Sequence, residues 1–364
     1  MGRVLTVLGT RPEIIRLSLT IARLDEACDH HVVYTGQNAD PRLSDIFFAE
    51  LGVRPPDTHL QIGGRRFADQ IGPLFTGVAD VIDRVRPTRL VVLGDTNSGL
   101  CALLAARMRV PVYHLEAGNR SDDPRSPEEV NRRAIDHVSS VLMPYTQGSA
   151  QRLAAEGIPA SRVHVIGNPI YDVLEAYAGH IAASRVGQTL RVRPGAFCLL
   201  TLHRAETVDV PDRLASALRA TATAAAAHGW PLVFPVHPRT RDRMDQSGVV
   251  RDLPGMILAP PLGFFDFVWL ERHAAAVFSD SGTVQEECAI LGSRNVVLRE
   301  YTERPETIES GASVLAGITP GGVAEALARL LARGEVPVPP ADYTIGGVAE
   351  RVTRLVLADE TGVS

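Results

Sequence analysis

The strongest constraint on the fold is a change of hydrophobic period that repeats along the chain. Short runs of β-branched residues alternate with longer Ala-, Leu- and Arg-rich segments whose apolar residues recur at helical spacing. This alternation is typical of βαβ units, in which parallel strands form a sheet covered by helices. In the first half it predicts strands at Val4–Leu8, His31–Thr35, Leu90–Leu93, Val112–Leu115, Val141–Met143 and Val163–Ile166.

The same pattern starts again after Gly167-Asn168-Pro169. It predicts six further strands, at Phe197–Leu202, Leu232–Val236, Met256–Leu258, Ala276–Phe278, Val296–Leu298 and Val314–Ala316. A chain of 364 residues is too long for one ordinary core. We therefore expect an α/β protein of two Rossmann-like domains, residues 1–168 and 169–345, with parallel sheets that face an interdomain cleft. Apolar residues at helical spacing predict a terminal helix within 346–364 that packs back on the N-terminal domain.

Composition narrows the class of protein. Hydrophobic residues make up 45% and charged residues 22%, as in globular proteins, and the net charge of −5 gives no field for nucleic acid. No apolar run reaches the ~20 residues of a membrane span. The N-terminal residues lack the apolar core and cleavage site of a signal peptide. We therefore expect a cytoplasmic protein without nucleic-acid or membrane partners.

The basic and sulfur-containing residues exclude several kinds of catalysis. All 37 basic residues are arginine, so a Schiff-base lysine, a pyridoxal-phosphate site and a Walker lysine are excluded. The four cysteines are scattered, without a CxxC pair, and indicate free thiols. No GxGxxG fingerprint, metal-ligand spacing or G-x-S-x-G elbow is present. We expect no metal and no nicotinamide or flavin cofactor.

Polar residues follow the predicted strands of the first domain. Gly9-Thr10-Arg11-Pro12-Glu13 reads as a strand-to-helix turn, where Arg11 and nearby Arg16 could bind an anion or be ordinary surface arginines. Asp95 could be a functional acid or a helix cap. Glu116 follows an apolar strand, where a carboxylate is costly unless it is paired or used.

A fourth acidic cluster is Ser126-Pro127-Glu128-Glu129. Ser126 and Glu129 have the spacing of a capping box, so Glu128 is the more plausible functional acid. Acids at several strand ends of one domain suggest proton transfer, because an epimerisation needs acid and base together.

The second domain offers groups that suit a diphosphate. His203-Arg204 follows one strand, and His237-Pro238-Arg239 follows the next, where a solvated loop is an equal alternative. Ser281, Gly282 and Thr283 precede a helix and could bind phosphate through backbone N–H groups.

Two acids and one arginine follow this turn in the chain, and we expect one of them to be structural and two to bind the nucleotide. Thr283 and Glu286 fit a capping box, which makes Glu286 structural. Glu287 could accept hydrogen bonds from a ribose diol. Arg304, in the loop Glu303–Glu306, is a candidate diphosphate clamp.

Taken in order, these motifs resemble the non-hydrolysing UDP-N-acetylglucosamine 2-epimerase family. The matching segments are GTRPE (9–13), GDT (94–96), EAG (116–118), PEE-x-NR (127–132), HR (203–204), DSG-x-x-QEE (280–287) and TERPE (302–306). The resemblance implies a GT-B-like fold, a homodimer and no metal or redox cofactor. It also implies a reaction in which UDP is eliminated anti across carbons 1 and 2 and adds back after reprotonation from the opposite face.

The resemblance also assigns roles to residues. It implies that Asp95, Glu116 and Glu128 are the proton-transfer acids and that His203 assists at the diphosphate. It implies that UDP is held by Arg11, Arg16, Ser281, Gly282, Thr283, Glu287 and Arg304, with Phe267 near the uracil. For Phe267, a core position is the alternative.

The details of the motifs bear on the sugar. GDTNS, EAGNR, HPRTR, PLGFFD and DSGT look like the branch that makes UDP-N-acetyl-L-fucosamine from UDP-2-acetamido-2,6-dideoxy-L-talose. The alternatives are a hydrolysing epimerase that releases UDP and free sugar, a GT-B glycosyltransferase, and a nucleotide-sugar binding protein without turnover. All three proposed acids are present, which argues against the last.

Overall fold

The chain forms two compact units, which we call unit 1 and unit 2 and describe separately. The computed structural model describes residues 2–37, 41–63, 66–123, 126–236, 238–247, 253, 255–334 and 336–358. Unit 1 contains the chain up to Glu175 and the segment from Asp342 onward, and unit 2 contains Ala176–Ala341. The first boundary falls after residue 168 because Asp172 still hydrogen-bonds to the backbone of Gly347 and Val348 in unit 1.

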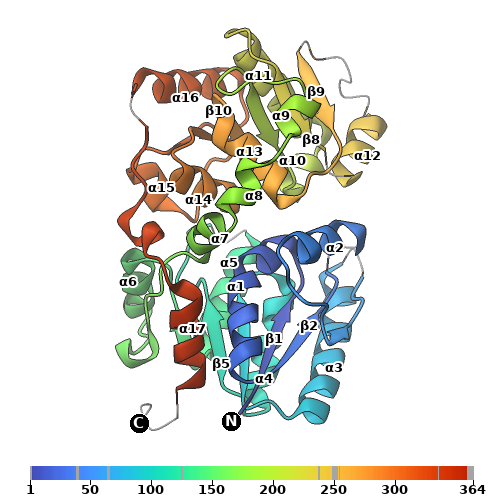
Figure 1. Cartoon of the computed structure of the whole chain (residues 1–364), viewed down its shortest axis with the longest axis vertical. Helices are drawn as coiled ribbons and strands as arrows, with labels where there is room; N and C mark the ends of the chain where they lie inside the picture. Colours follow the sequence, from blue (N-terminus) through green and yellow to red (C-terminus); the bar gives the residue numbers. More distant parts are fainter. Residues whose placement is uncertain are drawn as a thin grey trace. The chain divides into compact units, whose positions relative to one another are not determined.

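Unit 1 is built on a six-stranded parallel sheet with the order β3-β2-β1-β4-β5-β6. Figure 1 labels β1, β2 and β5 of this sheet. The strands are β1 (Arg3–Leu8), β2 (Asp29–Tyr34), β3 (Thr58–His59), β4 (Arg89–Leu93), β5 (Val112–Leu115) and β6 (Val141–Met143). The strand order reverses between β1 and β4, and these two strands pair with each other in parallel. At such a switch point, loops at the carboxyl ends of the strands form the usual binding site.

Helices connect the strands of unit 1. They are α1 (Arg11–Ala27), α2 (Pro41–Glu50), α3 (Phe67–Val85), α4 (Cys101–Arg107), α5 (Pro127–Val138), α6 (Gln147–Ala155), α7 (Pro169–Ala176) and α17 (Val348–Leu357), with 3₁₀ turns at Asn97–Leu100, Ala160–Arg162 and Ala341–Thr344. Their apolar residues recur at helical spacing, and in α3 Leu74, Val78 and Val81 are buried in the core. The terminal helix α17 packs against α1.

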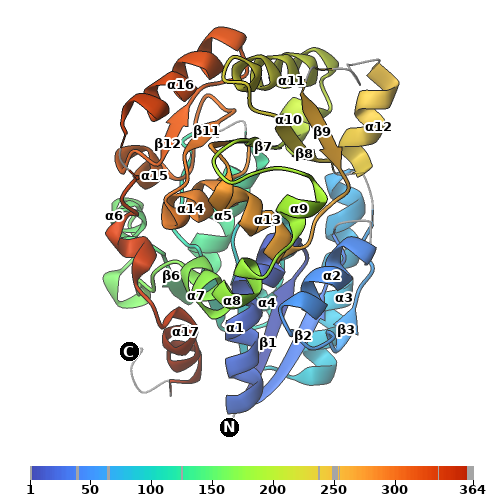
Figure 2. The same ribbon diagram turned by 45° about the horizontal axis from the view of Figure 1, so that its top comes forward.

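Unit 2 repeats the design with the sheet order β12-β11-β10-β7-β8-β9. Its strands are β7 (Cys198–Thr201), β8 (Leu232–Pro235), β9 (Met256–Ala259), β10 (Ala276–Ser279), β11 (Asn295–Val297) and β12 (Ser313–Leu315). Its helices are α8 (Ala178–Ala182), α9 (Val186–Thr189), α10 (Ala205–Val208), α11 (Pro211–Ala226), α12 (Pro238–Ser247), α13 (Phe264–His273), α14 (Gly282–Leu291), α15 (Pro305–Glu309) and α16 (Pro320–Ala332). The alanine-rich α11 lies beside α16 (Figure 2).

The predicted α/β class with two Rossmann-like parallel sheets is confirmed, with two differences in unit 1. Val163–Ile166 is not a strand, because only Val163 makes a bridge, to Leu142 of β6. The sixth strand is β3 (Thr58–His59), whose two residues are too few to show a hydrophobic period. The four cysteines are free thiols. Among the described helices, none has the length and apolar character that crossing a membrane requires.

Candidate active site

The turn between β1 and α1 is built around Gly9 and Glu13. A side chain at residue 9 would collide with the hydroxyls of Thr35 and Ser98, which hydrogen-bond to each other at 2.7 Å. Glu13 is 1% exposed and accepts hydrogen bonds from the backbone N–H groups of Gly9 and Thr10 at 3.1 and 2.8 Å. Burial raises the pKa of Glu13 to about 7, although these hydrogen bonds oppose the shift. The turn therefore contains a titratable acid that the motif pattern did not assign to the site.

The two predicted anion-binding arginines of α1 have different surroundings. Arg11 is partly exposed, and its guanidinium lies 5.8 Å from the ring centroid of Phe47. Burial of much of the side chain lowers the pKa of Arg11 from its usual value. Arg16 is buried, and its Nη1 donates to Oε2 of Glu116 at 2.5 Å. Arg16 therefore neutralises Glu116, whereas Arg11 presents part of its surface to solvent.

Glu116, at the end of β5, has a strained backbone. Its φ is 69°, in the left-handed region that is unfavourable for residues with a side chain. Gly94, at the end of β4, has a φ of 71°, and a Cβ on it would lie 3.7 Å from the Glu116 carboxylate. Because β4 and β5 pair with Leu93 opposite Leu115, Asp95 and Glu116 follow neighbouring strands. The structure thus brings these two predicted acids to the same edge of the sheet.

Helix α5 holds the loop that carries Asp95. The carboxylate of Asp95 pairs with Arg132, and its backbone carbonyl accepts a hydrogen bond from Asn131 Nδ2 at 2.9 Å. Arg132 also donates to Glu129 at 3.2 Å. The asparagine and arginine of the PEE-x-NR motif therefore fix the position of a predicted proton-transfer acid.

The predicted capping box at Ser126 is wrong. Ser126 is the N-cap of α5, but its side chain makes no capping hydrogen bond. Its hydroxyl donates instead to Glu128 at 2.8 Å. Glu129 is structural for a different reason, because it accepts a hydrogen bond from the backbone N–H of Ser121 at 2.9 Å and binds Arg132. Glu128 is partly exposed in the first turn of α5.

A buried charge cluster that the sequence pattern missed supports the same edge. His114 lies on β5, with Nδ1 at 2.8 Å from Asp136 Oδ1 and Nε2 at 3.0 Å from the carbonyl of Gly94. Burial alone would favour a protonated Asp136, but its contacts with His114 and Arg120 hold the pKa of that carboxyl below its usual value. Asp136 also accepts from the backbone N–H of Gly118 at 3.1 Å. The cluster therefore ties the backbone on both sides of Glu116.

In unit 2, His203 is oriented by Asp280. The Nδ1 atom of His203 lies 3.0 Å from Asp280 Oδ1, and the same carboxylate accepts the backbone N–H groups of His203 and Arg204 at 3.1 and 3.0 Å. Burial opposes ionisation of Asp280, but His203 and Arg204 hold its pKa below the usual value. The His203 side chain is 46% exposed, so the aspartate fixes the ring while Nε2 stays accessible to a ligand.

The start of α14 combines glycine with hydroxyl side chains. Ser281 is the N-cap, and its hydroxyl lies 3.3 Å from that of Thr283. A Cβ at Gly282 would lie 2.5 Å from Glu303 Oε1, so the loop that contains Glu303 approaches the helix start closely. The backbone N–H groups of this turn belong to a helix terminus, which favours anions.

The second predicted capping box is also wrong. Thr283 lies inside α14 rather than at its N-cap, so Glu286 is not at the capping position. Glu286 is completely buried and pairs with Arg304. Arg304 is itself buried, and its Nη1 also donates to the backbone carbonyl of Glu303 at 3.3 Å. Arg304 thus connects the loop before α15 to α14, next to Gly282.

The remaining predicted residues of unit 2 have distinct surroundings. Phe267, on α13, is partly buried against an apolar cluster. Glu287 is 4% exposed in α14. His237 lies outside the described residues. Among the described residues, no three His, Cys, Asp or Glu side chains are grouped as a metal would require, so we assign no metal ligands.

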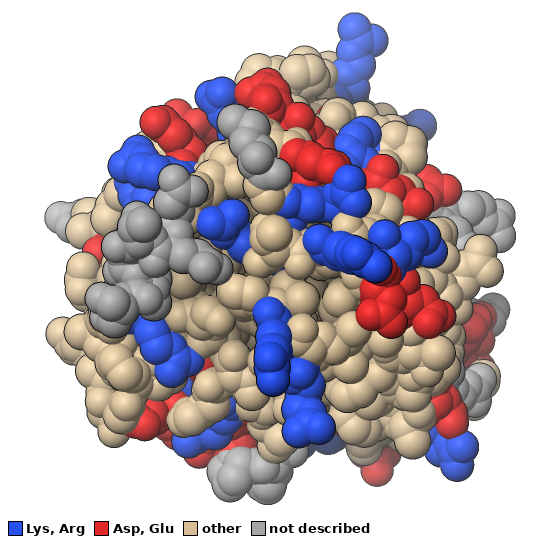
Figure 3. Space-filling model, turned by 90° about the horizontal axis from the view of Figure 1, so that it is seen from below, with Lys and Arg blue, Asp and Glu red and all other residues tan. Residues whose placement is uncertain are grey.

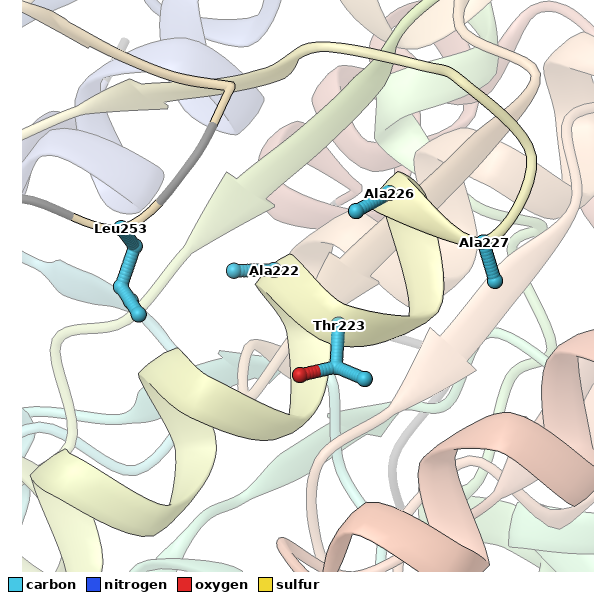
Figure 4. Close-up of a pocket in the computed structure, with 5 residues that line it drawn as sticks. All are labelled: Ala222, Thr223, Ala226, Ala227 and Leu253. Carbon is cyan, nitrogen blue, oxygen red and sulfur yellow. The ribbon is translucent and has the colours of Figure 1, made fainter.

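Other surface features do not resemble an active site. A hollow beside α11 is lined by Ala222, Thr223, Ala226, Ala227 and Leu253 (Figure 4). Its lining has no titratable side chain. On the face drawn in Figure 3, arginines and acidic residues are interspersed. That face therefore offers no extended field of one sign to a polyanion.

Comparisons with known proteins agree with these motifs. The family model described as UDP-N-acetylglucosamine 2-epimerase matches residues 22–357. The chain is 36% identical to a Methanocaldococcus jannaschii UDP-N-acetylglucosamine 2-epimerase over 85% of this chain and 87% of the relative. It is 35% identical to a Pseudomonas aeruginosa UDP-2,3-diacetamido-2,3-dideoxy-D-glucuronate 2-epimerase over 86% of this chain and 88% of the relative.

Solved structures confirm the fold. The crystal structure of the Methanocaldococcus jannaschii UDP-GlcNAc 2-epimerase in complex with UDP-GlcNAc and UDP has a TM-score of 0.91 at 33% identity, and the match covers 97% of this chain and 99% of that one. A Phytolacca americana protein complexed with UDP-2fluoro-glucose and pterostilbene has a TM-score of 0.54 at 10% identity, a likeness of fold alone, over 100% of this chain and 97% of that one. The GT-B-like fold is thereby confirmed. The chain is an isomerase that belongs to the UDP-N-acetylglucosamine 2-epimerase family.

Proposed function

We propose that this chain inverts carbon 2 of a UDP-N-acetylhexosamine by anti elimination of UDP and re-addition. The observation that carries the proposal is the pair of acids at neighbouring strand ends of unit 1, Asp95 and Glu116, each joined to an arginine of the unit. Buried arginines hold the carboxylates in fixed positions. Proton removal from one face of a sugar and return to the other requires such oriented acids and bases.

In this mechanism Glu116, Asp95 and Glu128 share the proton transfers at carbon 2. The proton on that carbon is barely acidic, so departure of the diphosphate must assist its removal. His203 suits this step, because Asp280 orients its ring. The imidazole Nε2–H would then stabilise charge on the leaving diphosphate.

The other predicted residues would hold UDP. The Ser281-Gly282-Thr283 turn at the start of α14 would bind the diphosphate through backbone N–H groups and hydroxyls. Arg304 supports that turn through Glu286 and carries positive charge toward it. Arg11 would add a second cation, Glu287 would accept the ribose hydroxyls, and Phe267 would contact the uracil.

We further propose that the chain acts as a cytoplasmic homodimer and that its sugar belongs to the 6-deoxy-L-hexosamine branch. The motifs GDTNS, HPRTR and DSGT support the branch. A D-sugar remains a competing substrate, because the relatives at 36% and 35% identity are named for two different D-sugars. Light scattering of the purified chain tests the dimer, and a monomer would contradict it.

The test of the function is proton NMR in deuterated water without any acceptor. The donors are UDP-N-acetylglucosamine, UDP-2,3-diacetamido-2,3-dideoxy-D-glucuronate and UDP-2-acetamido-2,6-dideoxy-L-talose, each offered separately. We expect deuterium at carbon 2 together with the epimer of the talose donor, and no free sugar. Accumulation of UDP and free sugar would instead show a hydrolysing enzyme, and the absence of exchange with every donor would contradict the proposal.

A further inference from the structure

A second carboxyl group lies beside Glu287 in the core of unit 2. Glu271, on α13, has no exposed surface, and Glu287, on the adjoining α14, is 4% exposed. The two acids lie on helices that pack together, and their chain neighbours Leu270 and Cys288 belong to a buried apolar cluster. An acid in such surroundings is costly unless a partner compensates it.

The partner of Glu271 is not an ordinary hydrogen-bond donor. Within the described part of the chain, neither of its carboxyl oxygens is within reach of an N–H or hydroxyl donor. The group that the carboxyl faces is the carboxyl of Glu287. Ser293 donates at 2.9 Å to the backbone carbonyl of Glu271, not to its side chain. A hydrogen bond between two carboxyl groups requires that one of them carries a proton.

The surroundings decide which acid holds that proton. Burial and the neighbouring Glu287 raise the pKa of Glu271 well above its usual value. Cys288, which follows Glu287 in α14, is also titratable, and burial together with the two acids raises the pKa of its thiol, so it stays neutral. Of the other helices that pack on α13, α9 has no titratable side chain, and His180 of α8 stacks on Phe265 near the start of α13.

We propose that Glu271 is a positioning residue that keeps a proton and donates it in a hydrogen bond to Glu287, which then presents an oriented carboxylate to the ribose diol of a uridine nucleotide. The proton remains on Glu271 throughout. The inference rests on the proposed function, which gives Glu287 its ribose role. Without the proton the two carboxylates would repel each other, and Glu287 would turn away from its binding position.

The test is calorimetric binding of UDP and 2′-deoxy-UDP to the full chain and to two variants. Glu271→Gln keeps a donor for Glu287, whereas Glu271→Leu has a similar size and no donor. We expect wild type and Glu271→Gln to prefer UDP by roughly 10-fold or more, as charged hydrogen bonds do. In Glu271→Leu the preference should fall to within about threefold. Because Leu suits an apolar site, this variant should fold, and its melting curve checks that.

A pH series supplies a readout that a purely structural role would not affect. Burial and the neighbouring Glu287 raise the pKa of Glu271 well above its usual value, so its proton should be lost only at raised pH, and the preference of wild type for UDP should decline there. In Glu271→Gln it should stay constant, because no proton can be lost. Three results would each overturn the inference. They are a preference for UDP over 2′-deoxy-UDP in Glu271→Leu equal to that of wild type, a decline of this preference with pH in Glu271→Gln that parallels wild type, and no preference for UDP in wild type. Deuterium exchange on the same wild-type sample decides the epimerase function separately.

Discussion

At the scale of single residues, the carboxylates of Asp95 and Glu116 are each paired with an arginine, but they differ from two other paired acids of unit 1, Glu129 and Asp136. Glu129 and Asp136 bind backbone N–H groups and arginines. Asp95 and Glu116 instead follow strand ends at the switch point of the sheet. A group that is retained there at the cost of a left-handed backbone, as Glu116 is, has the character of a functional residue.

This assignment predicts a separation of binding from turnover. Glu116→Gln and Asp95→Asn should each reduce the rate of deuterium exchange by roughly 10²- to 10⁴-fold, because general acid–base catalysis is lost. UDP binding, which we assign to residues of unit 2 and to Arg11, should change little. Asp122→Asn is the matched control, because Asp122 also has a positive φ, of 57°, but is exposed and pairs with Arg152. Normal exchange in both active-site variants would rule out the acid–base role.

The raised pKa of Glu13 leads to a second prediction, which concerns the pH dependence of the protein's stability. Its folded pKa of about 7 exceeds the ordinary value of 4.5, so folding takes up a proton between these two pH values. The free energy of unfolding of the wild type should therefore fall as pH rises from about 4.5 to about 7, by up to ~1.4 kcal/mol per pH unit.

Glu13→Gln should remove this pH dependence. The amide oxygen can accept from the N–H of Thr10, and the amide nitrogen can donate to Thr96, so the turn keeps its hydrogen bonds. Urea unfolding at a series of pH values compares the two proteins. Parallel stability profiles would show that Glu13 is ionised throughout.

The residues that the sequence missed share a physical cause. Asp280 and Asp136 act through partners that are distant in the chain, 77 and 22 residues away for His203 and His114, which local spacing does not reveal. The two predicted capping boxes were wrong for different reasons: Ser126 is the N-cap of α5 but donates its hydroxyl to Glu128, whereas Thr283 lies inside α14. In α14 the helix begins at Gly282, and Glu286 meets Arg304 instead. Sequence motifs found the acids at the strand ends because those acids follow apolar runs directly.

At the scale of elements, hydrophobic period predicted the buried strands well and the edge of unit 1 poorly. All six strands of unit 2 lie where apolar runs predicted them, because parallel strands are buried on both faces. Strand β3 pairs at only two positions, and Val163 makes a single bridge at the opposite edge. An edge strand needs fewer apolar residues, so its sequence carries less signal.

The β1–α1 turn gives the element-scale prediction. Gly9→Ala should destabilise unit 1 by about 1–3 kcal/mol, because the added methyl group overpacks the hydroxyls of Thr35 and Ser98. Gly148→Ala is the control, because a Cβ there meets only Thr146 Oγ1, at 3.7 Å, and alanine favours the helix by about 0.5–1 kcal/mol. Denaturant unfolding measures both. A neutral Gly9→Ala would show that the turn can open without cost.

At the scale of the whole molecule, the chain passes through unit 2 and returns to unit 1. Helix α17 has a glycine N-cap and no capping side chain of its own, and Asp172 of α7 accepts its first N–H groups, at 3.0 Å from Gly347 and 2.7 Å from Val348. Val348, Val352 and Val356 form its buried face. The hydrophobic period predicted this helix, but its partner depends on contacts between residues far apart in the chain.

This arrangement predicts that damage to α17 weakens unit 1 selectively. Val352→Asp places a charge in an apolar contact and should cost roughly 3 kcal/mol or more. Both tryptophans of the chain, Trp230 and Trp269, belong to unit 2, so tryptophan fluorescence reports that unit alone, whereas circular dichroism reports both. In the variant, part of the circular dichroism signal should melt early while the fluorescence transition stays near its wild-type temperature. Arg354→Ala, on the exposed side of α17, is the control and should leave both transitions unchanged. If Val352→Asp shifts the two signals together, the units unfold as one cooperative body.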